Sequence, residues 1–291
     1  MDMRAILMGL AFAFIWSSAF TSARIIVADA PPLASLAVRF FISGILGVIL
    51  ARMMGQTWNL TRDQWRATFI FGLCQNALYL GLNFVAMQTI EASLASIIAS
   101  VMPLMVAFAG WAIFRDRLPA MAVAGLAAGV IGVAIIMGAR INEGVDIYGI
   151  TLCGVGAVAL TVATLSMRGA SSGGNLMMVV GLQMLVGSAA LAVTSASTEV
   201  ITVNWTWELG AAMAYTTLAP GLLATWIWFA LVARIGAVRA ATFHFLNPFF
   251  GVAIAAVLLG ETLGLMDLVG VAIIMVGILA VQLSKSKPSQ T

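Results

Sequence analysis

The chain consists almost entirely of apolar runs that are each about as long as a lipid bilayer is thick. A helix needs about 20 apolar residues to cross the hydrocarbon core of a membrane. Only 9% of the 291 residues are charged, which is too few to give a soluble domain of this size a polar surface. The sequence therefore predicts an all-α integral membrane protein with ten transmembrane helices. The predicted spans are Arg4–Val27, Leu33–Met53, Trp65–Met87, Ser93–Phe114, Ala120–Gly138, Ile147–Met167, Leu176–Ser195, Trp207–Leu231, Val238–Leu259 and Leu265–Leu283.

Loop charges give an independent test of this number of spans. If the N-terminus is cytoplasmic and the spans alternate in direction, 11 of the 14 Lys and Arg residues fall on the cytoplasmic side. The other three are Arg24, Arg39 and Arg140. This positive-inside bias indicates that both termini are cytoplasmic, with a polar cytoplasmic tail over 284–291. Because the basic residues are scattered singly, we expect the lipid bilayer to surround the chain and no nucleic acid to bind it.

Similarity at a constant offset of 145 residues indicates an internal repeat. The aligned pairs include Pro103 and Pro248, Gly125 and Gly270, Gly132 and Gly277, and Asp116 and Glu261. Five spans per half is an odd number, so the second half must enter the membrane from the opposite face. We therefore expect two inverted-topology five-helix repeats, 1–140 and 145–283, with a substrate cavity near the midplane where they meet.

Three motifs carry a family resemblance. They are RFFISGIL in the second span, SLASIIASVMPLMVAFAGWAIFRDRL in the fourth, and its counterpart AATFHFLNPFFGVAIAAVLLGETL in the ninth. Over essentially its whole length the chain resembles the EamA type of the drug/metabolite transporter superfamily, and it is similar to the bacterial aromatic amino-acid exporters of that group. The resemblance implies an alternating-access carrier in the bacterial inner (cytoplasmic) membrane that exports amino acids or related small metabolites.

Polar side chains recur at helical spacing inside the apolar runs. Unpaired polar atoms cost several kcal/mol when they face acyl chains, so these side chains face protein or water. One interpretation is that they hold helices together. The other is that they bind substrate, with aromatic and Met side chains as an apolar wall. The candidate substrate-binding residues are Trp16, Asn76, Tyr79, Asn83, Ser100, Met102, Tyr215, Trp226, His244 and Asn247.

Pro103 and Pro248 occupy equivalent places in the two repeats. Each proline removes a backbone donor and frees a carbonyl one turn earlier. We expect a kink at each, acting either as a hinge during transport or as a static bend. Glycines at helical spacing in the fifth and tenth spans favour close helix packing, within the chain or in a homodimer.

The absence of some residue types narrows the function. No Asp or Glu lies well inside a predicted span, so a neutral or zwitterionic substrate is expected. Cys74 and Cys153 are isolated and act as small hydrophobic residues, and neither a metal nor a cofactor is expected. Transport is facilitated, or it has a weak proton dependence through His244, the single histidine.

Two other functions are compatible with the sequence. A membrane enzyme could use His244 as a base, but it would also need a nucleophile, a second acid or a metal set. A scaffold or receptor would have no need of an inverted repeat.

Arg39 lies about two turns inside the second span, where it either reaches towards the interface or pairs with Glu91, or binds an anion.

Overall fold

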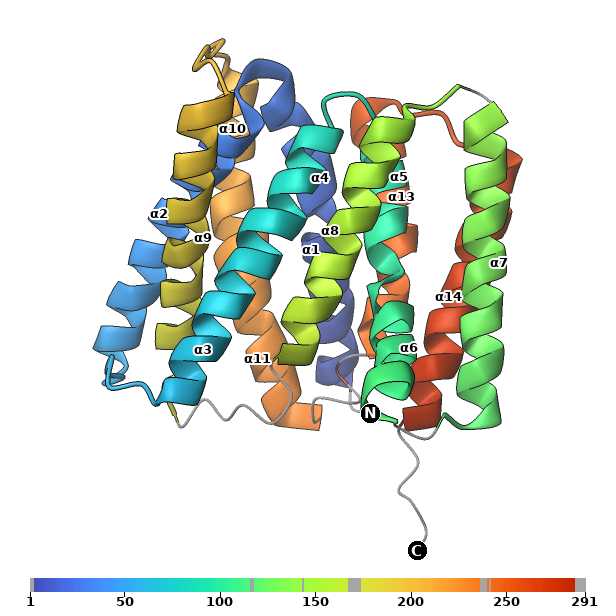
Figure 1. Ribbon diagram of the computed structural model, residues 1–291, viewed down its shortest axis with the longest axis horizontal. Coiled ribbons are helices and arrows are strands. Elements are labelled where there is room, and N and C mark those ends of the chain that lie inside the picture. The colour runs from blue at the N-terminus through green and yellow to red at the C-terminus, as the bar shows by residue number, and fades with distance from the viewer. Residues whose placement is uncertain are drawn as a thin grey trace, which may run out of the picture. The chain divides into compact units, whose positions relative to one another are not determined.

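The computed structural model describes residues 3–115, 118–142, 144–166, 174–235, 240 and 242–285. These residues form helices joined by short loops, without a β-strand among them (Figure 1). The first half contains α1 Met3–Asp29, α2 Pro32–Met53, α3 Arg62–Phe71, η1 Gly72–Tyr79, α4 Leu80–Ala86, α5 Ala92–Ser100, α6 Met102–Phe114 and α7 Ala120–Asn142. The second contains α8 Ile147–Ser166, α9 Leu176–Thr198, α10 Trp207–Thr216, η2 Thr217–Leu223, α11 Ala224–Ile235, η3 Thr242–Leu246, α13 Asn247–Leu259 and α14 Leu265–Lys285.

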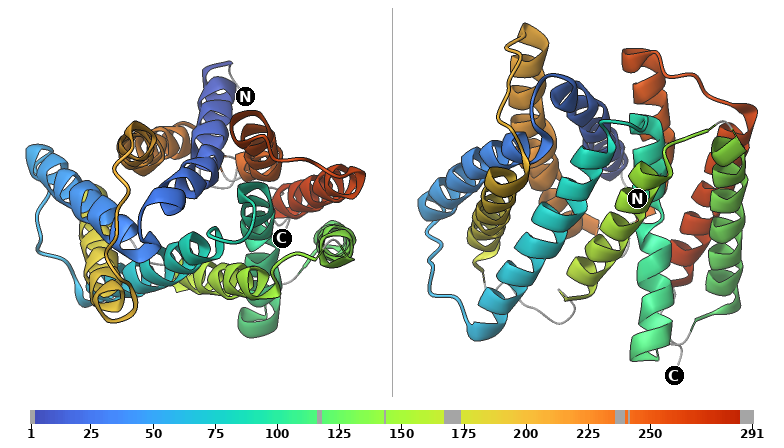
Figure 2. Two further views of the ribbon diagram at one scale, coloured as in Figure 1. Left: turned by 90° about the horizontal axis from the view of Figure 1, so that it is seen from above. Right: turned by 45° about the horizontal axis from the view of Figure 1, so that its top comes forward.

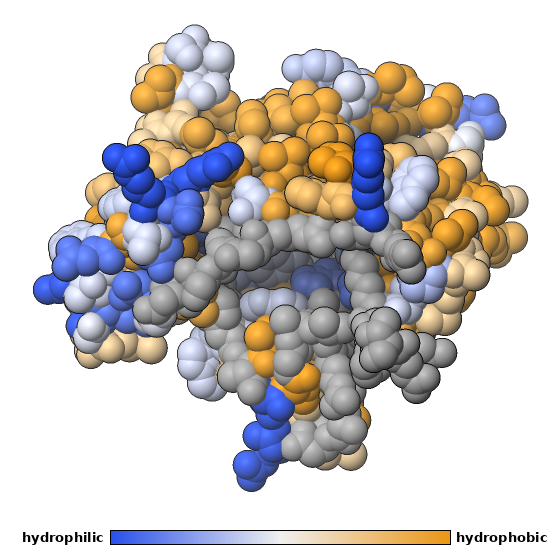
Figure 3. Space-filling view, turned by 60° about the horizontal axis from the view of Figure 1, so that its bottom comes forward, coloured by the Kyte–Doolittle hydropathy of each residue, from blue (hydrophilic) through white to orange (hydrophobic). Residues whose placement is uncertain are grey.

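The ten-helix membrane fold is confirmed. In the described part of the chain, 9 helical spans are long and apolar enough to cross a bilayer, and a shorter apolar helix covers Phe243–Leu259. Hydrophobic residues cover large parts of the surface visible in Figure 3. Val130 of α7, Val257 of α13 and Val276 of α14 are among the exposed side chains. Such a surface is stable where lipid is the solvent.

The helices group into two compact units. Unit 1 contains Met1–Thr21, Ile90–Ile150 and Leu223–Thr291, and unit 2 contains Ser22–Thr89 and Thr151–Leu222. Three of the four boundaries fall inside α1, α8 and η2, and the fourth lies between α4 and α5. Each unit therefore takes helices from both halves of the sequence.

In unit 1, α7 and α14 pack closely along a seam of glycines and lie side by side in Figures 1 and 2. A Cβ atom added to Gly125 would lie 2.6 Å from the carbonyl oxygen of Gly277. One added to Gly270 would lie 2.8 Å from the carbonyl oxygen of Gly132. A shift of 145 residues exchanges these two contacts, so the antiparallel pair has the local two-fold symmetry of an inverted repeat. The seam uses these glycines within one chain, and a homodimer stays a prediction.

In unit 2, the paired helices α2 and α9 cap each other at opposite ends. The Glu199 carboxylate, which follows α9, accepts hydrogen bonds of 2.8 and 2.9 Å from the backbone N–H groups of Leu33 and Ala34 at the start of α2. Gln56, which follows α2, accepts a 3.0 Å bond from the N–H of Met178 at the start of α9. Leu33 and Met178 are repeat equivalents. Each helix thus supplies an acceptor for the unpaired donors that begin the other.

A charge cluster joins the ends of α5, α7 and α14 in unit 1. Arg140 donates to both carboxylate oxygens of Asp267, at 3.1 and 2.8 Å, and lies 2.9 Å from the Glu91 carboxylate. Glu261 accepts bonds of 2.8 and 3.0 Å from the first two N–H groups of α5. The sequence placed Arg140 in a loop beyond a fifth span ending at Gly138. The helix itself continues four residues further, to Asn142, and near its end two carboxylates pair with Arg140.

We expect Gly125→Val to lower the unfolding temperature in detergent, because the added atoms would meet the backbone of α14. Overpacking of this kind costs about 1–3 kcal/mol. Gly138→Val is the matched control in the same helix, because nothing lies within 4 Å of a Cβ atom there. Thermal unfolding followed by tryptophan fluorescence measures both. If both variants lowered the unfolding temperature equally, the close packing of Gly125 against α14 would be contradicted.

We expect Glu91→Gln to weaken the dependence of stability on pH. Burial raises the pKa of the Glu91 carboxyl above 4.5, Arg140 opposes this effect, and Glu261 adds to it. A raised pKa means that the folded protein holds the proton more tightly, so stability falls as the pH rises from 4.5 through the raised value. The measurement is the unfolding temperature between pH 4.5 and neutral pH.

Gln cannot ionise, so the variant should lose less stability than the wild type over this window. Glu208→Gln, at an exposed residue in the first turn of α10, should keep the wild-type pH dependence. An unchanged slope in Glu91→Gln would assign the pH dependence to other groups.

Candidate functional site

Both spans that contain the aligned prolines are interrupted. In the fourth span α5 ends at Ser100 and α6 begins at Met102, with Pro103 in the first turn of α6. In the ninth span α13 begins at Asn247, directly after the 3-10 segment η3, with Pro248 in its first turn. Met102 and Asn247 are repeat equivalents. Proline is favoured at the start of a helix, where its missing N–H would lack a partner in any case.

These prolines also remove the usual α-helical donor of two carbonyl groups at equivalent places. A helical residue normally donates to the carbonyl four residues earlier. Pro103 and Pro248 cannot donate, so the carbonyls of Ala99 and His244 lose their helical donors. Discontinuous helices of this kind build the substrate sites of many inverted-repeat carriers. The predicted hinge role of the two prolines stays a prediction.

Two further departures from α-helix lie in unit 2. The π-helical segment η1 begins at Gly72 in the third span, and η2 begins at Thr217 in the eighth. These two starting residues are also related by the 145-residue offset. Pro220 lies inside η2. Short π-helical segments are rare and are often found at functional sites.

His244 lies beside a helix break in unit 1 and inside a group of aromatic rings. Asn247 Nδ2 donates to His244 Nδ1 over 3.0 Å, which leaves the imidazole proton on Nε2. The ring centroids of Phe12 and Trp228 lie 5.3 and 5.1 Å from that of His244. Trp16 extends this wall, with its ring centroid 5.7 Å from that of Phe12. The site is therefore polar along one helix and aromatic around it.

Asn247 retains one unused acceptor. Its backbone carbonyl accepts a 3.2 Å bond from Ser17 Oγ. Its side-chain Oδ1 is buried and has no hydrogen-bond partner among the described residues. A buried amide oxygen without a donor costs about 1–3 kcal/mol. This atom is therefore available to a ligand that carries an N–H or O–H group.

The other predicted site residues of unit 1 lie in different surroundings. Ser100 Oγ donates to the carbonyl of Ser96 over 2.7 Å and is satisfied within its own helix. Met102 is half-buried at the start of α6. Trp226 of α11 is 63% exposed, so it faces outwards from the described part of unit 1.

The two predicted site asparagines of unit 2 are buried and hydrogen-bonded to neighbouring segments. Asn76 Nδ2 in η1 donates to the carbonyl of Gln183 in α9 over 3.0 Å. Asn83 Nδ2 donates to the carbonyl of Tyr79 over 2.8 Å, and its Oδ1 accepts from the thiol of Cys153 at 3.3 Å. The structure thus brings Asn76, Tyr79 and Asn83 onto one packed face. Their hydrogen bonds favour the interpretation that they hold helices together, and binding of substrate by them stays a prediction.

Tyr215 also belongs to unit 2 but is more exposed than these three residues. It is on α10, two residues before η2, and is 39% exposed. Its role in substrate binding likewise stays a prediction.

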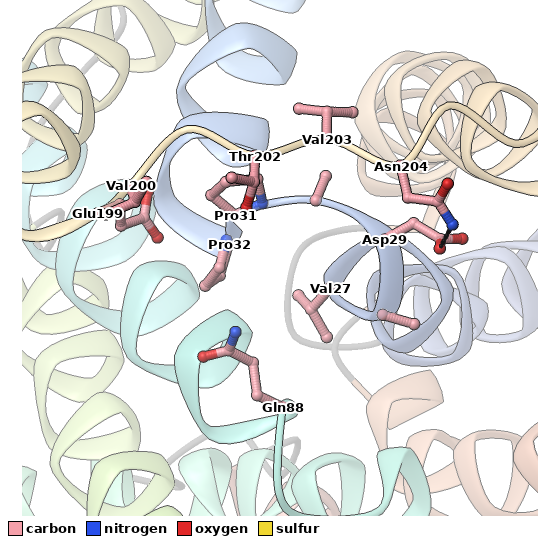
Figure 4. Close-up of a pocket in the computed structure, with 12 residues that line it drawn as sticks. Val27, Asp29, Pro31, Pro32, Gln88, Glu199, Val200, Thr202, Val203 and Asn204 are labelled. Atoms are coloured by element: carbon pink, nitrogen blue, oxygen red, sulfur yellow. Dashed lines mark hydrogen bonds between the residues drawn. The ribbon is translucent and has the colours of Figure 1, made fainter.

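Unit 2 also contains a pocket of about 690 Å³ at the ends of α1 and α2 (Figure 4). Asp29 forms one wall and accepts 2.9 Å bonds from Asn204 Nδ2 and Thr206 Oγ1. Glu199 and Gln88 line it from other segments. This volume suits a small metabolite. The sequence did not predict the pocket, because its lining comes from short loops that are distant in the chain.

Phe12 and Trp228 were also absent from the predicted site. Phe12 precedes Trp16 by four residues, a spacing that places the two rings on one helix face. That spacing was the available signal for Phe12. Trp228 had no such signal, because its contact with His244 depends on how η3 folds back on α11.

The EamA-like transporter family matches residues 3–138 and 147–283, one segment in each half of the sequence. The chain belongs to the EamA-like transporter family. Its helices, its repeat and this match together make it a multi-pass integral membrane transporter.

Several relatives of this EamA-family chain are named as transporters, and one is named as an efflux pump. The "Uncharacterized transporter YvbV" of Bacillus subtilis is 27% identical over 280 residues, covering 96% of this chain and 91% of that protein. The "Probable amino-acid metabolite efflux pump" of Salmonella typhimurium is 26% identical, covering 91% and 90%. The "Uncharacterized inner membrane transporter YedA" of Escherichia coli is 25% identical, covering 93% and 88%. A solved crystal structure matches with a TM-score of 0.67 at 19% identity, covering 97% of this chain and 98% of that one, which supports the fold alone.

We expect His244→Ala to fold and to slow transport by about tenfold. The substitution leaves the Asn247 amide without its acceptor, and each unpaired buried polar group costs about 1–3 kcal/mol. His244→Gln is the matched variant, because it keeps a side-chain acceptor but cannot titrate. Transport should be measured from about pH 5 to pH 8, the range in which histidine changes charge. Wild-type rates and pH profiles in both variants would show that His244 serves packing only.

Proposed function

We propose that this transporter exports amino acids, neutral and aromatic ones foremost, together with related small metabolites. It does so by alternating access through a midplane cavity between its two repeats. The family resemblance supports export, and one relative is named as a probable amino-acid metabolite efflux pump. One relative is named as an inner membrane transporter, and the loop charges favour that membrane with both termini in the cytoplasm.

The observation that carries this proposal is the helix break at Asn247. The unpartnered Asn247 Oδ1 is an acceptor suited to an α-ammonium group. Phe12 and Trp228 contact the histidine and Trp16 contacts Phe12, so these rings can stack on an aromatic side chain or attract a cation. An aromatic amino acid carries both complementary groups.

Repeat-equivalent breaks support alternating access. If the two halves exchange conformations, a local change available to α5 and α6 must also be available to η3 and α13. The interruptions at Met102 and Asn247 give both spans that freedom at the same level. Inverted-repeat carriers use this kind of symmetry to open to either side of a membrane.

The second candidate is export of other neutral or amphiphilic metabolites, and the aromatic wall beside His244 suits an apolar surface of any such molecule. A membrane enzyme that uses His244 as a base is less well supported. The nearest hydrogen-bond partner of His244 is the carboxamide of Asn247, which can neither act as a nucleophile nor orient the ring as a carboxylate would.

Counterflow in proteoliposomes tests this function. Vesicles that contain the protein and are loaded with unlabelled phenylalanine should take up labelled phenylalanine faster than protein-free vesicles do. Leucine and tryptophan outside should compete, and glutamate and lysine should compete weakly. Asn247→Ala, which removes the free acceptor, should reduce uptake about tenfold.

The outcomes separate the candidates. Uptake of an amphiphilic dye or drug without any amino acid would favour the second candidate. If no amino acid or amphiphile moves above the background of protein-free vesicles, the proposed function is wrong.

A further inference from the structure

Arg39 of α2 is a buried cation in unit 2 without a counter-charge. Arg39 is 6% exposed, and its Nε has no hydrogen-bond partner among the described residues. It lies seven residues after Pro32, the first residue of α2. At 1.5 Å per residue this is about 10 Å along the helix, well inside the span.

The acidic residues of unit 2 are all engaged or placed elsewhere. Asp29 accepts bonds from Asn204 and Thr206, and Glu199 caps the start of α2. Asp63 and Glu208 are exposed in the first turns of α3 and α10. No ion pair with Arg39 is formed in the described part of the chain. The sequence also allowed an ion pair between Arg39 and Glu91. The Glu91 carboxylate instead contacts Arg140.

A small polar niche lies next to the guanidinium. Ser43 follows Arg39 by one helical turn, and its buried Oγ also lacks a partner among the described residues. Gly221 of η2 faces both. A Cβ atom at Gly221 would lie 3.5 Å from Ser43 Oγ, 3.9 Å from Arg39 Nη2 and 3.3 Å from the carbonyl oxygen of Thr216. The absent side chain of Gly221 therefore leaves a gap of little more than one carbon atom, on which the Ser43 hydroxyl and the Arg39 guanidinium converge.

Burial makes this arrangement costly unless an anion completes it. An uncompensated buried charge costs several kcal/mol, and a partner anion removes much of that cost. The Phe40 ring, 5.1 Å from Arg39 Cζ, is the one cation–π contact that Arg39 makes in the described structure, and it neutralises no charge. A guanidinium presents parallel N–H donors that match the two oxygens of a carboxylate. A serine hydroxyl beside it adds a third donor.

We infer that Arg39, Ser43 and the space at Gly221 form the carboxylate-binding subsite of this carrier. The inference rests on the proposed function and deepens it, because it makes a free carboxylate a requirement for transport. The subsite holds the carboxylate during at least one stage of the transport cycle. Amines, amides and alcohols of the same shape are then poor substrates.

Three related ligands test this requirement in the counterflow assay. Phenylalanine carries both charged groups, 3-phenylpropionate carries the carboxylate alone, and phenylalaninol carries the amine alone. Wild-type protein should bind phenylalanine at least about tenfold more tightly than phenylalaninol, the ratio expected for a hydrogen-bonded charge. It should also be inhibited by 3-phenylpropionate. Equal competition by phenylalanine and phenylalaninol in the wild type would overturn the inference without any variant.

Variants then assign the carboxylate preference to the subsite. Arg39→Gln should remove inhibition by 3-phenylpropionate and abolish the preference for phenylalanine over phenylalaninol. Arg39→Lys should keep part of both, because it keeps the charge but not the paired donors. Gly221→Ala should weaken carboxylate ligands selectively by filling the niche. Arg52→Gln, at an exposed arginine of the same helix, is the matched control and should change neither.

The result separates the inference from the function on which it rests. If wild-type vesicles transport no amino acid, the proposed function fails. If they transport phenylalanine and Arg39→Gln affects phenylalanine and phenylalaninol equally, the function stands and Arg39 has a structural role only. Thermal stabilisation of the wild type by phosphatidylglycerol, with none by 3-phenylpropionate, would assign Arg39 to a lipid phosphate and overturn the inference.

Discussion

Hydrogen bonding of the backbone inside lipid constrains every other feature of this protein. Without water, each N–H and C=O group in a span needs a partner within the protein, so regular helix is the default and any departure must be compensated. The described structure departs from α-helix in four spans, and the departures form two repeat-equivalent pairs. Side chains compensate locally: Asn83 donates to the carbonyl of Tyr79, and Ser17 donates to that of Asn247. Backbone irregularity in the described structure is thus paired between the two repeats.

Among the described residues, Arg140, Glu199 and Arg39 show how buried charged groups relate to this rule. Arg140 is buried at the end of α7 and is neutralised by two carboxylates, and Glu199 satisfies the N–H groups that begin α2. These are static, completed interactions that fix helix ends. Arg39 is equally buried but incomplete, and Asn247 Oδ1 is its neutral counterpart in the other unit. Ser43, Thr21, Ser93 and Ser96 also have buried hydroxyl groups without a partner among the described residues, and a ligand can supply the missing partner of such atoms.

The sequence predicted the features that depend on composition and local spacing. Spans, loop charges and the alignment of Pro103 with Pro248 required only the thickness of a bilayer and the chemistry of proline. The π-helical segments were not predicted, because Gly72 and Thr217 begin them in runs that read as ordinary apolar helix. The partners of Asn76 and Arg140 were also missed, since Gln183 and Asp267 lie more than 100 residues away in the chain. Such pairs depend on helix packing that no local pattern encodes.

The glycine seam between α7 and α14 has a consequence for whether the two repeats could exist as separate proteins. Each side of the seam is completed by the other repeat running in reverse. A protein made of one repeat would leave half of the seam against lipid, and a second copy could cover it only after inserting the opposite way up. One polypeptide would then have to be delivered in two orientations, which a strong bias of loop charge forbids. Covalent fusion removes the conflict, because each half can evolve the bias that its own orientation requires.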